Sequence, residues 1–312
     1  MYETARLTGR QGKGPVIGLA LGSGAARGWA HLGVIEALES QGVRPDVVCG
    51  CSIGALVGAA YVSERHQALS DWVLKLDWQA VVSMLDISFR GGLIRGDRVV
   101  QHCAQHFFAR EFAQLKRPFA TVATELSSGR EVWLREGRLA EAVRASIALP
   151  GLFSPVERQG RILVDGGLVN PVPVSLCRAL GADVVIAVEL GSGVVGRSLR
   201  KGAEGKETAE EVPGWPQRLR EAIGWPNGRD EPDAPPALPS LPDVVTTSIN
   251  IMQMRIARSR LAGEPADVLI SPRVAHISMM EFDRADEAIA EGRAAVARVQ
   301  GLHALLGVEA QS

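Results

Sequence analysis

A serine between two glycines constrains this chain more than any other feature. The apolar segment Val47 to Cys49 precedes Gly50-Cys51-Ser52-Ile53-Gly54, and only small or aliphatic residues follow, from Ala55 to Ala60. This order predicts a buried strand, a tight turn and a helix. A serine on such a turn projects its hydroxyl above the sheet edge, and the flanking glycines leave room that β-carbons would fill. We therefore predict a nucleophile elbow at Ser52, with a purely structural glycine turn as the alternative.

Two further predicted strands end in groups of related chemistry. The apolar segment Val16 to Leu21 runs into Gly22-Ser23-Gly24-Ala25-Ala26-Arg27-Gly28. A glycine-rich loop of this kind exposes main-chain N–H groups that bind a phosphate or an oxyanion. A third apolar segment, Ile162 to Val164, delivers Asp165 to a Gly-Gly turn. Because ligands bind at the carboxyl ends of strands in open α/β sheets, the sequence predicts a serine, a carboxylate and an oxyanion cradle at one sheet edge.

These segments together resemble the patatin-like phospholipase family, in particular bacterial proteins similar to the catalytic domain of neuropathy target esterase. The resemblance rests on the loop Gly22 to Gly28 with its continuation to Val34, the elbow Gly50 to Gly54, the block Ala145 to Val156, and the segment Asp165 to Pro173. The four motifs occur in this order between residues 16 and about 190. The resemblance implies a three-layer α/β/α fold with a mainly parallel central sheet, and a lipid or other ester as substrate.

The resemblance also implies roles for individual residues. In this family the serine accepts the acyl group and the aspartate takes its proton without a histidine, which implies a Ser52–Asp165 dyad. The implied oxyanion hole consists of the amides of Gly22, Ser23, Gly24 and Ile53. The residues that support the motifs are Ala25, Arg27, Gly28, Gly50, Gly54, Gly166 and Gly167.

Two features of these motifs affect the chemistry. The family's loop often reads Gly-Gly-Gly, and Ser23 stands at its middle place, which keeps the N–H donor but reduces backbone freedom. A carboxylate is a weak base for a hydroxyl, so the site must desolvate Asp165, and the apolar neighbours Val164 and Leu168 are consistent with that. Arg27 is either a partner for a substrate phosphate or a structural arginine on the helix surface or paired with a carboxylate.

Histidines offer competing interpretations. Ser52, Asp165 and His276 follow the chain order of an α/β-hydrolase triad, but the elbow comes after only two predicted strands, which is too early for that fold. His102 and His106 share one helix face and could ligate a metal, although no carboxylate accompanies them in the HExxH manner. We expect no metal and no cofactor.

Other functional classes remain as alternatives. The spacing Gly22-x-Gly24-x-x-x-Gly28 superficially matches a dinucleotide-binding loop, but the next predicted strand ends in the elbow and lacks the acidic residue that would bind the ribose. A short-chain carboxylesterase or thioesterase is the alternative within the enzymes. A catalytically silent regulatory binding protein on the same fold is the alternative outside them.

Length and composition favour one enzyme-sized domain. The chain has 312 residues, of which 46% are hydrophobic, and its formal net charge is −1, which argues against nucleic acid as a partner. We predict a short tail over residues 1–14 and a single catalytic domain over residues 15–312. No apolar run approaches the ~18 to 20 residues that cross a bilayer, and four cysteines without CxxC spacing suit a reducing compartment. We therefore expect a cytoplasmic protein, with peripheral membrane contact as a hypothesis.

One segment interrupts the α/β pattern. The stretch from Gly191 to Asp243 is rich in proline, glycine and charge, which predicts a flexible insertion. Within it, Trp215 to Trp225 could form a short amphipathic helix with a tryptophan at each end, suited to a membrane interface. A helix that caps the site or binds a partner is the alternative.

Elsewhere, periodicity predicts alternating strands and helices. The predicted strands are Val16 to Leu21, Val47 to Cys49, Phe119 to Glu125, Glu131 to Leu134, Ile162 to Val164, Val184 to Glu189 and Asp267 to Ile270. The predicted helices are Trp29 to Ser40, Ile53 to Val62, His66 to Lys75, Asp97 to Phe108, Leu139 to Ile147, Val174 to Leu180, Val244 to Leu261 and Glu281 to Val299. We expect Phe119 to Glu125 and Glu131 to Leu134 to pair antiparallel across Ser127-Ser128-Gly129.

Overall fold

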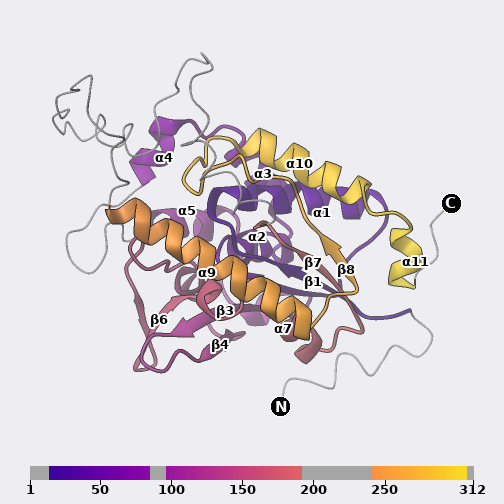
Figure 1. Ribbon diagram of the computed structural model, residues 1–312, viewed down its shortest axis with the longest axis horizontal. Helices are drawn as coiled ribbons and strands as arrows, with labels where there is room; N and C mark the ends of the chain where they lie inside the picture. The colour runs from indigo at the N-terminus through magenta and orange to yellow at the C-terminus, as the bar shows by residue number, and fades with distance from the viewer. Residues whose placement is uncertain (1–13, 85–95, 192–240, 308–312) are drawn as a thin grey trace.

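The computed structural model describes residues 14–84, 96–191 and 241–307. Within these residues an eight-stranded mixed sheet forms the middle layer, and helices cover both of its faces (Figure 1). The strands are β1 (Ile17–Leu21), β2 (Val47–Cys51), β3 (Phe119–Glu125), β4 (Glu131–Leu134), β5 (Val156–Arg158), β6 (Arg161–Asp165), β7 (Val184–Val188) and β8 (Val268–Ile270). The three-layer α/β/α arrangement expected from the sequence is therefore present.

Strand order places the predicted site strands side by side. The main path through the sheet is β5-β6-β3-β2-β1-β7-β8. The pairs β1–β2, β1–β7, β2–β3 and β7–β8 are parallel, whereas β3–β4, β3–β6 and β5–β6 are antiparallel. The antiparallel pairing of β3 with β4 was expected from the turn between them. Parallel strands need crossover connections, and the helices between them provide these.

Strand β3 brings the ends of β2 and β6 together. It pairs with β2 as far as Cys51↔Val122 and with β6 from Ala123↔Asp165 onward. Strand β4 pairs with residues 121–124 of β3, so it overlaps with both partners. Because a strand has only two edges, β2 and β6 must share the edge of β3 that β4 does not occupy. The two strands therefore point at each other along this edge, and their carboxyl ends meet.

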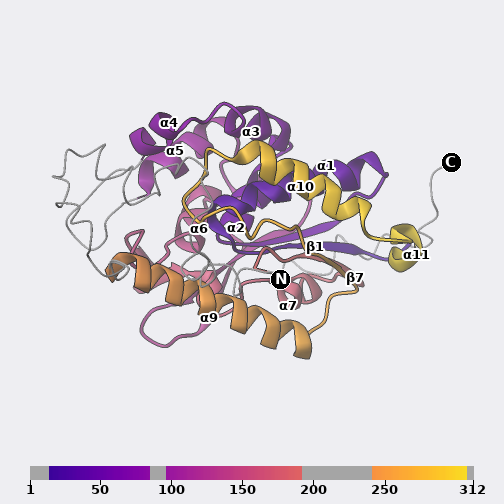
Figure 2. The ribbon, with the colours of Figure 1, turned by 45° about the horizontal axis from the view of Figure 1, so that its top comes forward.

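The helices form two outer layers. The η labels denote 3-10 helices, and the elements are η1 (Ala25–Trp29), α1 (Ala30–Ser40), α2 (Ile53–Val62), α3 (His66–Val73), α4 (Trp78–Met84), α5 (Asp97–His106), η2 (Phe112–Gln114), α6 (Leu139–Ser146), η3 (Gly166–Leu168), α7 (Val174–Ala179), α9 (Leu241–Gly263), α10 (Ala285–Ala297) and α11 (Leu302–Leu306). Helices α1, α3 and α10 lie on one side of the sheet, and α7 and α9 lie on the other (Figure 2).

Alternating side chains along the strands fill both cores. Leu19 and Leu21 of β1 belong to the larger apolar cluster with α1, α2 and α10, whereas Ala20 between them belongs to the cluster with α7 and α9. In β2, Val48 likewise faces the larger cluster and Cys49 the smaller one. All five residues are fully buried. Both faces of a central strand are thus apolar, which is why these strands show no polar alternation in sequence.

The bounds of several elements differ from the sequence prediction. Helix α4, strand β5 and helix α11 were not predicted, and the last predicted helix begins at Ala285 rather than four residues earlier. Most of the predicted insertion from Gly191 to Asp243, including the proposed short helix Trp215 to Trp225, lies outside the described residues, as do residues 1–13 of the predicted tail. Among the helices that the structure describes, none is sufficiently long and apolar to span a bilayer.

Candidate active site

Ser52 lies on the tight turn between β2 and α2. Its backbone angles, φ 56° and ψ −124°, are strained for a residue with a β-carbon and cost roughly 1–3 kcal/mol. The neighbouring glycines allow the turn to be this compact. A β-carbon at Gly50 would lie 2.4 Å from the carbonyl oxygen of Gly54, and one at Gly54 would lie 2.2 Å from that of Leu21. The start of α2 is therefore pressed against the carboxyl end of β1.

Asp165 at the end of β6 reaches Ser52 directly. The Ser52 hydroxyl donates to Oδ2 of Asp165 at 2.6 Å, and the amide of Gly167 donates to Oδ1 at 2.7 Å. The carboxyl is fully buried, and this burial raises its pKa from 3.8 to about 6, although the two hydrogen bonds favour the charged form. A carboxylate with this pKa is a better base than an exposed one and is still ionised at neutral pH.

Ser146, the last residue of α6, holds the elbow in place. Its hydroxyl donates to the carbonyl oxygen of Val122 at 2.6 Å and accepts the Ser52 amide at 2.9 Å. The side chain is fully buried. It thus ties the strained residue to β3, the strand that also aligns Asp165. Sequence reasoning assigned no role to Ser146, although it lies in the block Ala145 to Val156 that carries the family resemblance.

The glycine-rich loop uses two of its amides for structure. Gly22 N–H donates to the carbonyl oxygen of Val188 at 3.1 Å, and Ser23 N–H donates to that of Pro171 at 2.8 Å. Neither amide is free to bind an oxyanion. The prediction for Gly22 and Ser23 is therefore wrong, because main-chain acceptors from remote segments already satisfy these donors.

Other amides near Ser52 are available instead. Within the described residues, the N–H groups of Gly24, Ala25 and Ile53 make no hydrogen bond to the protein. Ala25 has φ 51°, so its backbone is strained in the same way as that of Ser52. Ala25, Ser52 and Ile53 all line the same pocket. The amide of Ile53 also opens α2, where the helix dipole favours negative charge.

An apolar pocket opens beside the Ser52 hydroxyl. Its volume, counted to the open mouth and including open solvent, is about 840 Å³. Its walls come from η1, from helices α2 to α5, from the loop after α6 and from the loop that precedes α10. Representative lining residues are Trp29, Leu56, Trp72, Val99, Leu149 and Phe282. Ser52 thus adds a hydroxyl group to an otherwise apolar lining.

The loop over residues 276–284 fixes η1 and part of the pocket wall. Three donors of η1 bond to its carbonyl oxygens: the Ala26 amide to Met279 at 3.1 Å, Nε of Arg27 to Ile277 at 2.9 Å, and the Trp29 indole to Phe282 at 3.1 Å. Arg27 is only 4% exposed, and this burial lowers its pKa to about 10 against the opposing effect of Glu189 and Glu281. Arg27 is therefore a buried residue that connects η1 to the loop through its hydrogen bond to Ile277.

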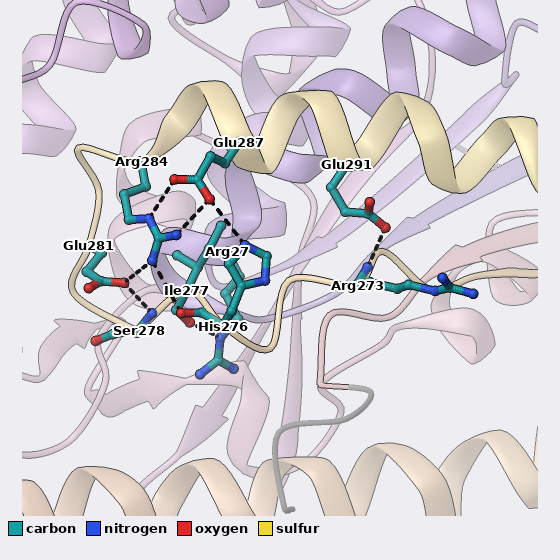
Figure 3. A network of polar contacts seen from close by, with 9 residues as sticks. All are labelled: Arg27, Arg273, His276, Ile277, Ser278, Glu281, Arg284, Glu287 and Glu291. Atoms are coloured by element: carbon teal, nitrogen blue, oxygen red, sulfur yellow. Dashed lines mark hydrogen bonds and ion pairs between the residues drawn. The ribbon is translucent and has the colours of Figure 1, made fainter. Parts of the chain in front are cut away.

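Arg284 braces this loop from the start of α10 (Figure 3). Its guanidinium contacts Glu287 at 2.6 Å and Glu281 at 3.1 Å, and it also donates to the carbonyl oxygen of His276. Glu281 in turn accepts the amide of Ser278 at 2.7 Å. His276 contacts Glu287 at 3.3 Å. These contacts hold the two ends of the loop together. The carbonyl groups of Ile277, Met279 and Phe282 accept the hydrogen bonds from η1.

The family model for patatin-like phospholipases matches residues 19–178, which is just over half of the chain and includes both Ser52 and Asp165. This chain belongs to the patatin-like phospholipase family. Membership in the family supports lipid acyl hydrolysis as the general activity, and it agrees with the resemblance seen in the sequence.

Several individual proteins are similar to this chain, and two of them are described as NTE family proteins. An uncharacterized NTE family protein of Mycobacterium tuberculosis is 33% identical over 94% of both chains, as is one from Mycobacterium bovis. Human patatin-like phospholipase domain-containing protein 6 is 33% identical over 57% of this chain and 14% of its own length. The crystal structure of VipD from Legionella pneumophila aligns over 93% of this chain and 66% of that chain, with 13% identity and a TM-score of 0.43.

The histidine alternatives find no support at the patatin-like site. No histidine within the described residues bonds to Ser52 or Asp165: His276 contacts Glu287, and His31 contacts the carbonyl oxygen of Gly22. The rings of His102 and His106 lie 4.6 Å apart, and Trp72 stacks on the former. In the described part of the chain, no three His, Cys, Asp or Glu side chains are grouped to hold a metal.

Sequence reasoning missed a contribution from α9. Gln253, which is 6% exposed, lies between the glycine-rich loop and the Asp-Gly-Gly turn. Its Oε1 accepts the Ser23 hydroxyl at 3.4 Å, and its Nε2 would lie 2.5 Å from a β-carbon at Gly167. The only sequence signal was a glutamine at a buried position of a long helix. Such a signal does not distinguish Gln253 from an ordinary packing residue.

Proposed function

We propose that this protein is a serine acyl hydrolase that cleaves a carboxyl ester of a (lyso)phospholipid or a related lipid. One observation carries the proposal. The Ser52 hydroxyl donates to the buried Asp165 carboxylate at 2.6 Å, in the wall of an open apolar pocket. Nucleophile, base and a place for an acyl chain thus occur together.

In the first half-reaction, Ser52 would become acylated. Asp165 accepts the hydroxyl proton as Oγ attacks the ester carbonyl, and the carbonyl oxygen becomes a tetrahedral oxyanion. The free amides of Gly24, Ala25 and Ile53 are the donors for this oxyanion. When the intermediate collapses, the ester C–O bond breaks, and protonated Asp165 returns its proton to the leaving alcohol.

In the second half-reaction, water would release the acid. Asp165 takes a proton from water as the water oxygen attacks the acyl-enzyme carbonyl, and the same amides bind the second oxyanion. Collapse breaks the bond to Ser52 Oγ, which recovers its proton from Asp165. One carboxylate therefore acts alternately as base and acid, and a pKa of about 6 allows both roles near neutral pH.

The pocket supports a long acyl chain over a short one. Its walls include Trp72, Val81 and Val99 from α3, α4 and α5, in addition to the residues next to Ser52 in the chain. Burial of each methylene contributes ~0.8 kcal/mol, so a chain that fills the pocket binds much more tightly than a butyrate. A short-chain carboxylesterase or thioesterase would not need the apolar walls that α3 to α5 add.

The test is hydrolysis of p-nitrophenyl esters from butyrate to palmitate, followed by defined lysophospholipids. Ser52→Ala and Asp165→Asn should both abolish turnover while circular dichroism stays unchanged. Val99→Trp should reduce the pocket, so long-chain esters lose turnover while butyrate keeps it. Activity that survives in Ser52→Ala would refute the mechanism. Butyrate as the best substrate in the wild type would favour the short-chain alternative, and no reaction with esters or fluorophosphonate probes would favour a silent binding protein.

Access to lipid would require contact with a lipid surface, which we propose α9 provides. Among the side chains of this helix that the structure describes, Val244, Val245, Ile251 and Met252 are apolar and 40 to 50% exposed. Cγ1 of Val245 would lie 3.5 Å from a β-carbon at Gly151, in the loop that lines the pocket. Met252→Glu should weaken co-sedimentation with phosphatidylcholine vesicles. Leu305→Glu on α11, which is 51% exposed, is the matched control and should not.

A further inference from the structure

His31 on α1 is a buried histidine next to the glycine-rich loop. It is fully buried, and its Nε2 lies 2.8 Å from the carbonyl oxygen of Gly22. A carbonyl oxygen only accepts hydrogen bonds, so Nε2 carries the proton and Nδ1 does not. Burial lowers the pKa of His31 to about 4, although the bond to Gly22 favours the charged form. The ring is therefore a neutral donor throughout the neutral range.

Packing alone does not explain a histidine at this position. Nδ1 of His31 is buried and has no hydrogen-bond partner within the described residues. An unpartnered buried nitrogen destabilises a fold, and an aliphatic side chain would avoid that cost. What histidine supplies here, and an aliphatic residue cannot, is the Nε2–H donor to Gly22.

That donor acts on one particular peptide plane. The Gly22 carbonyl and the Ser23 amide belong to the same peptide group, and the Ser23 amide donates to the carbonyl oxygen of Pro171 at 2.8 Å. His31 and Pro171 therefore hold both edges of this plane. The amide of Ala26 is fixed separately on the carbonyl oxygen of Met279. Only the two amides between these anchors, those of Gly24 and Ala25, remain unbonded within the described part of the chain.

We propose that His31 is a positioning residue, whose Nε2–H fixes the Gly22–Ser23 peptide so that the Gly24 and Ala25 amides face the reacting carbonyl at Ser52. This proposal rests on the hydrolase function proposed above. A β-carbon at Gly54 would lie 2.7 Å from the Gly22 carbonyl oxygen, so this oxygen lies against the first turn of α2. Once released from His31, the oxygen could turn toward the first amides of α2 and compete with substrate for the oxyanion donors.

The test compares His31→Gln, which puts an amide nitrogen near the place of Nε2, with His31→Met, which keeps bulk but removes the donor. We expect His31→Met to lower kcat at least ~10-fold with KM nearly unchanged, because oxyanion-hole donors act on the transition state. Affinity for an alkyl trifluoromethyl ketone, which forms a tetrahedral adduct with Ser52, should fall in parallel. His31→Gln should recover most of both.

The chain provides a matched control in His303. Its Nε2 lies 2.9 Å from the carbonyl oxygen of Gln41 at the other end of α1, so His303→Met removes a bond of the same kind away from Ser52. We expect His303→Met to lower the melting temperature without changing kcat. Equal kcat in His31→Met and wild type, or equal losses in His31→Gln and His31→Met, would overturn the proposal.

Failure of the hydrolase function would be recognised separately. In that case the wild type neither hydrolyses esters nor reacts with a fluorophosphonate. The amide chemical shifts of Gly24 and Ala25 then test the geometry without activity. They should move in His31→Met and stay close to wild type in His31→Gln and His303→Met. Unchanged shifts in His31→Met would overturn the positioning role.

Discussion

Replacing Asp165 with asparagine should abolish hydrolysis and make the fold more stable at pH 8. The substitution preserves shape, and both hydrogen bonds have an equivalent: the asparagine oxygen can accept the Gly167 amide, and its NH₂ group can donate to the Ser52 hydroxyl. What is lost is a negative charge in a fully buried position. Wild type therefore carries a cost of ionisation that the variant does not.

The magnitude follows from the pKa of Asp165. Burial raises it from 3.8 to about 6, and each pKa unit corresponds to ~1.4 kcal/mol. Because the folded pKa exceeds the unfolded one, the unfolded chain binds fewer protons between these values. The stability of the wild type therefore falls as pH rises from about 4 to about 6, and the total loss is about 3 kcal/mol. Asp165→Asn has no such loss.

Urea unfolding of both proteins at several pH values measures this difference. At pH 8 the free energy of unfolding should be about 3 kcal/mol larger for Asp165→Asn, and the difference should vanish near pH 4. Ser52→Ala keeps the carboxylate and removes one donor to it, so this control should show no gain at pH 8. A gain in Asp165→Asn that is the same at both pH values would refute the electrostatic argument, as would a loss of stability at pH 8.

Three further outcomes test the site. The kcat/KM of the wild type should rise with pH on an apparent pKa near 6, because Asp165 must be ionised to act as base, and a flat profile between about pH 5 and pH 8 would contradict this. Ser146→Ala should lower kcat roughly tenfold in steady-state assays with little change in KM, because Ser52 loses the partner of its amide; an unchanged kcat would mean that the elbow is held without it. Gly54→Ala should prevent stable folding, as judged by thermal melting, because its β-carbon would lie 2.2 Å from a backbone oxygen of β1. Gly58→Ala on the same helix should fold, because its β-carbon meets side chains instead, the Phe119 ring at 2.9 Å and Leu21 at 3.5 Å.

Much of the fold could be predicted from local sequence patterns. The strands Phe119–Glu125 and Glu131–Leu134 and the helix Ile53–Val62 have the predicted bounds, because each is a clear periodic or apolar segment between turn residues. Helix α4, strand β5 and helix α11 are between three and seven residues long, which is too short to show a clear periodic pattern. Their formation depends on packing against the rest of the chain, which a local pattern does not record.

The candidate site shows the same division. The glycines of the elbow and the apolar segments before Ser52 and Asp165 could be identified locally, and the family resemblance supplied the pairing of these two residues. The assignment of Gly22 and Ser23 as oxyanion donors was wrong, because their amides are satisfied by the carbonyl groups of Val188 and Pro171, which are remote in sequence. Loop amides look alike in a sequence, and only the folded chain determines which of them stay unbonded.

The loop over residues 276–284 has a consequence for how this enzyme family could diverge. Met280 and Phe282 line the pocket, while the carbonyl groups of the same loop bond to η1 beside Ser52. A substitution that reshapes the pocket at Met280 or Phe282 also shifts the support of η1. In the proposed hydrolase, substrate preference and turnover rate are therefore linked at this wall, and evolution toward a new acyl chain here would have to re-optimise the rate. The walls formed by α3 to α5 have no such bonds to η1 within the described residues, so they are the better place to change preference alone.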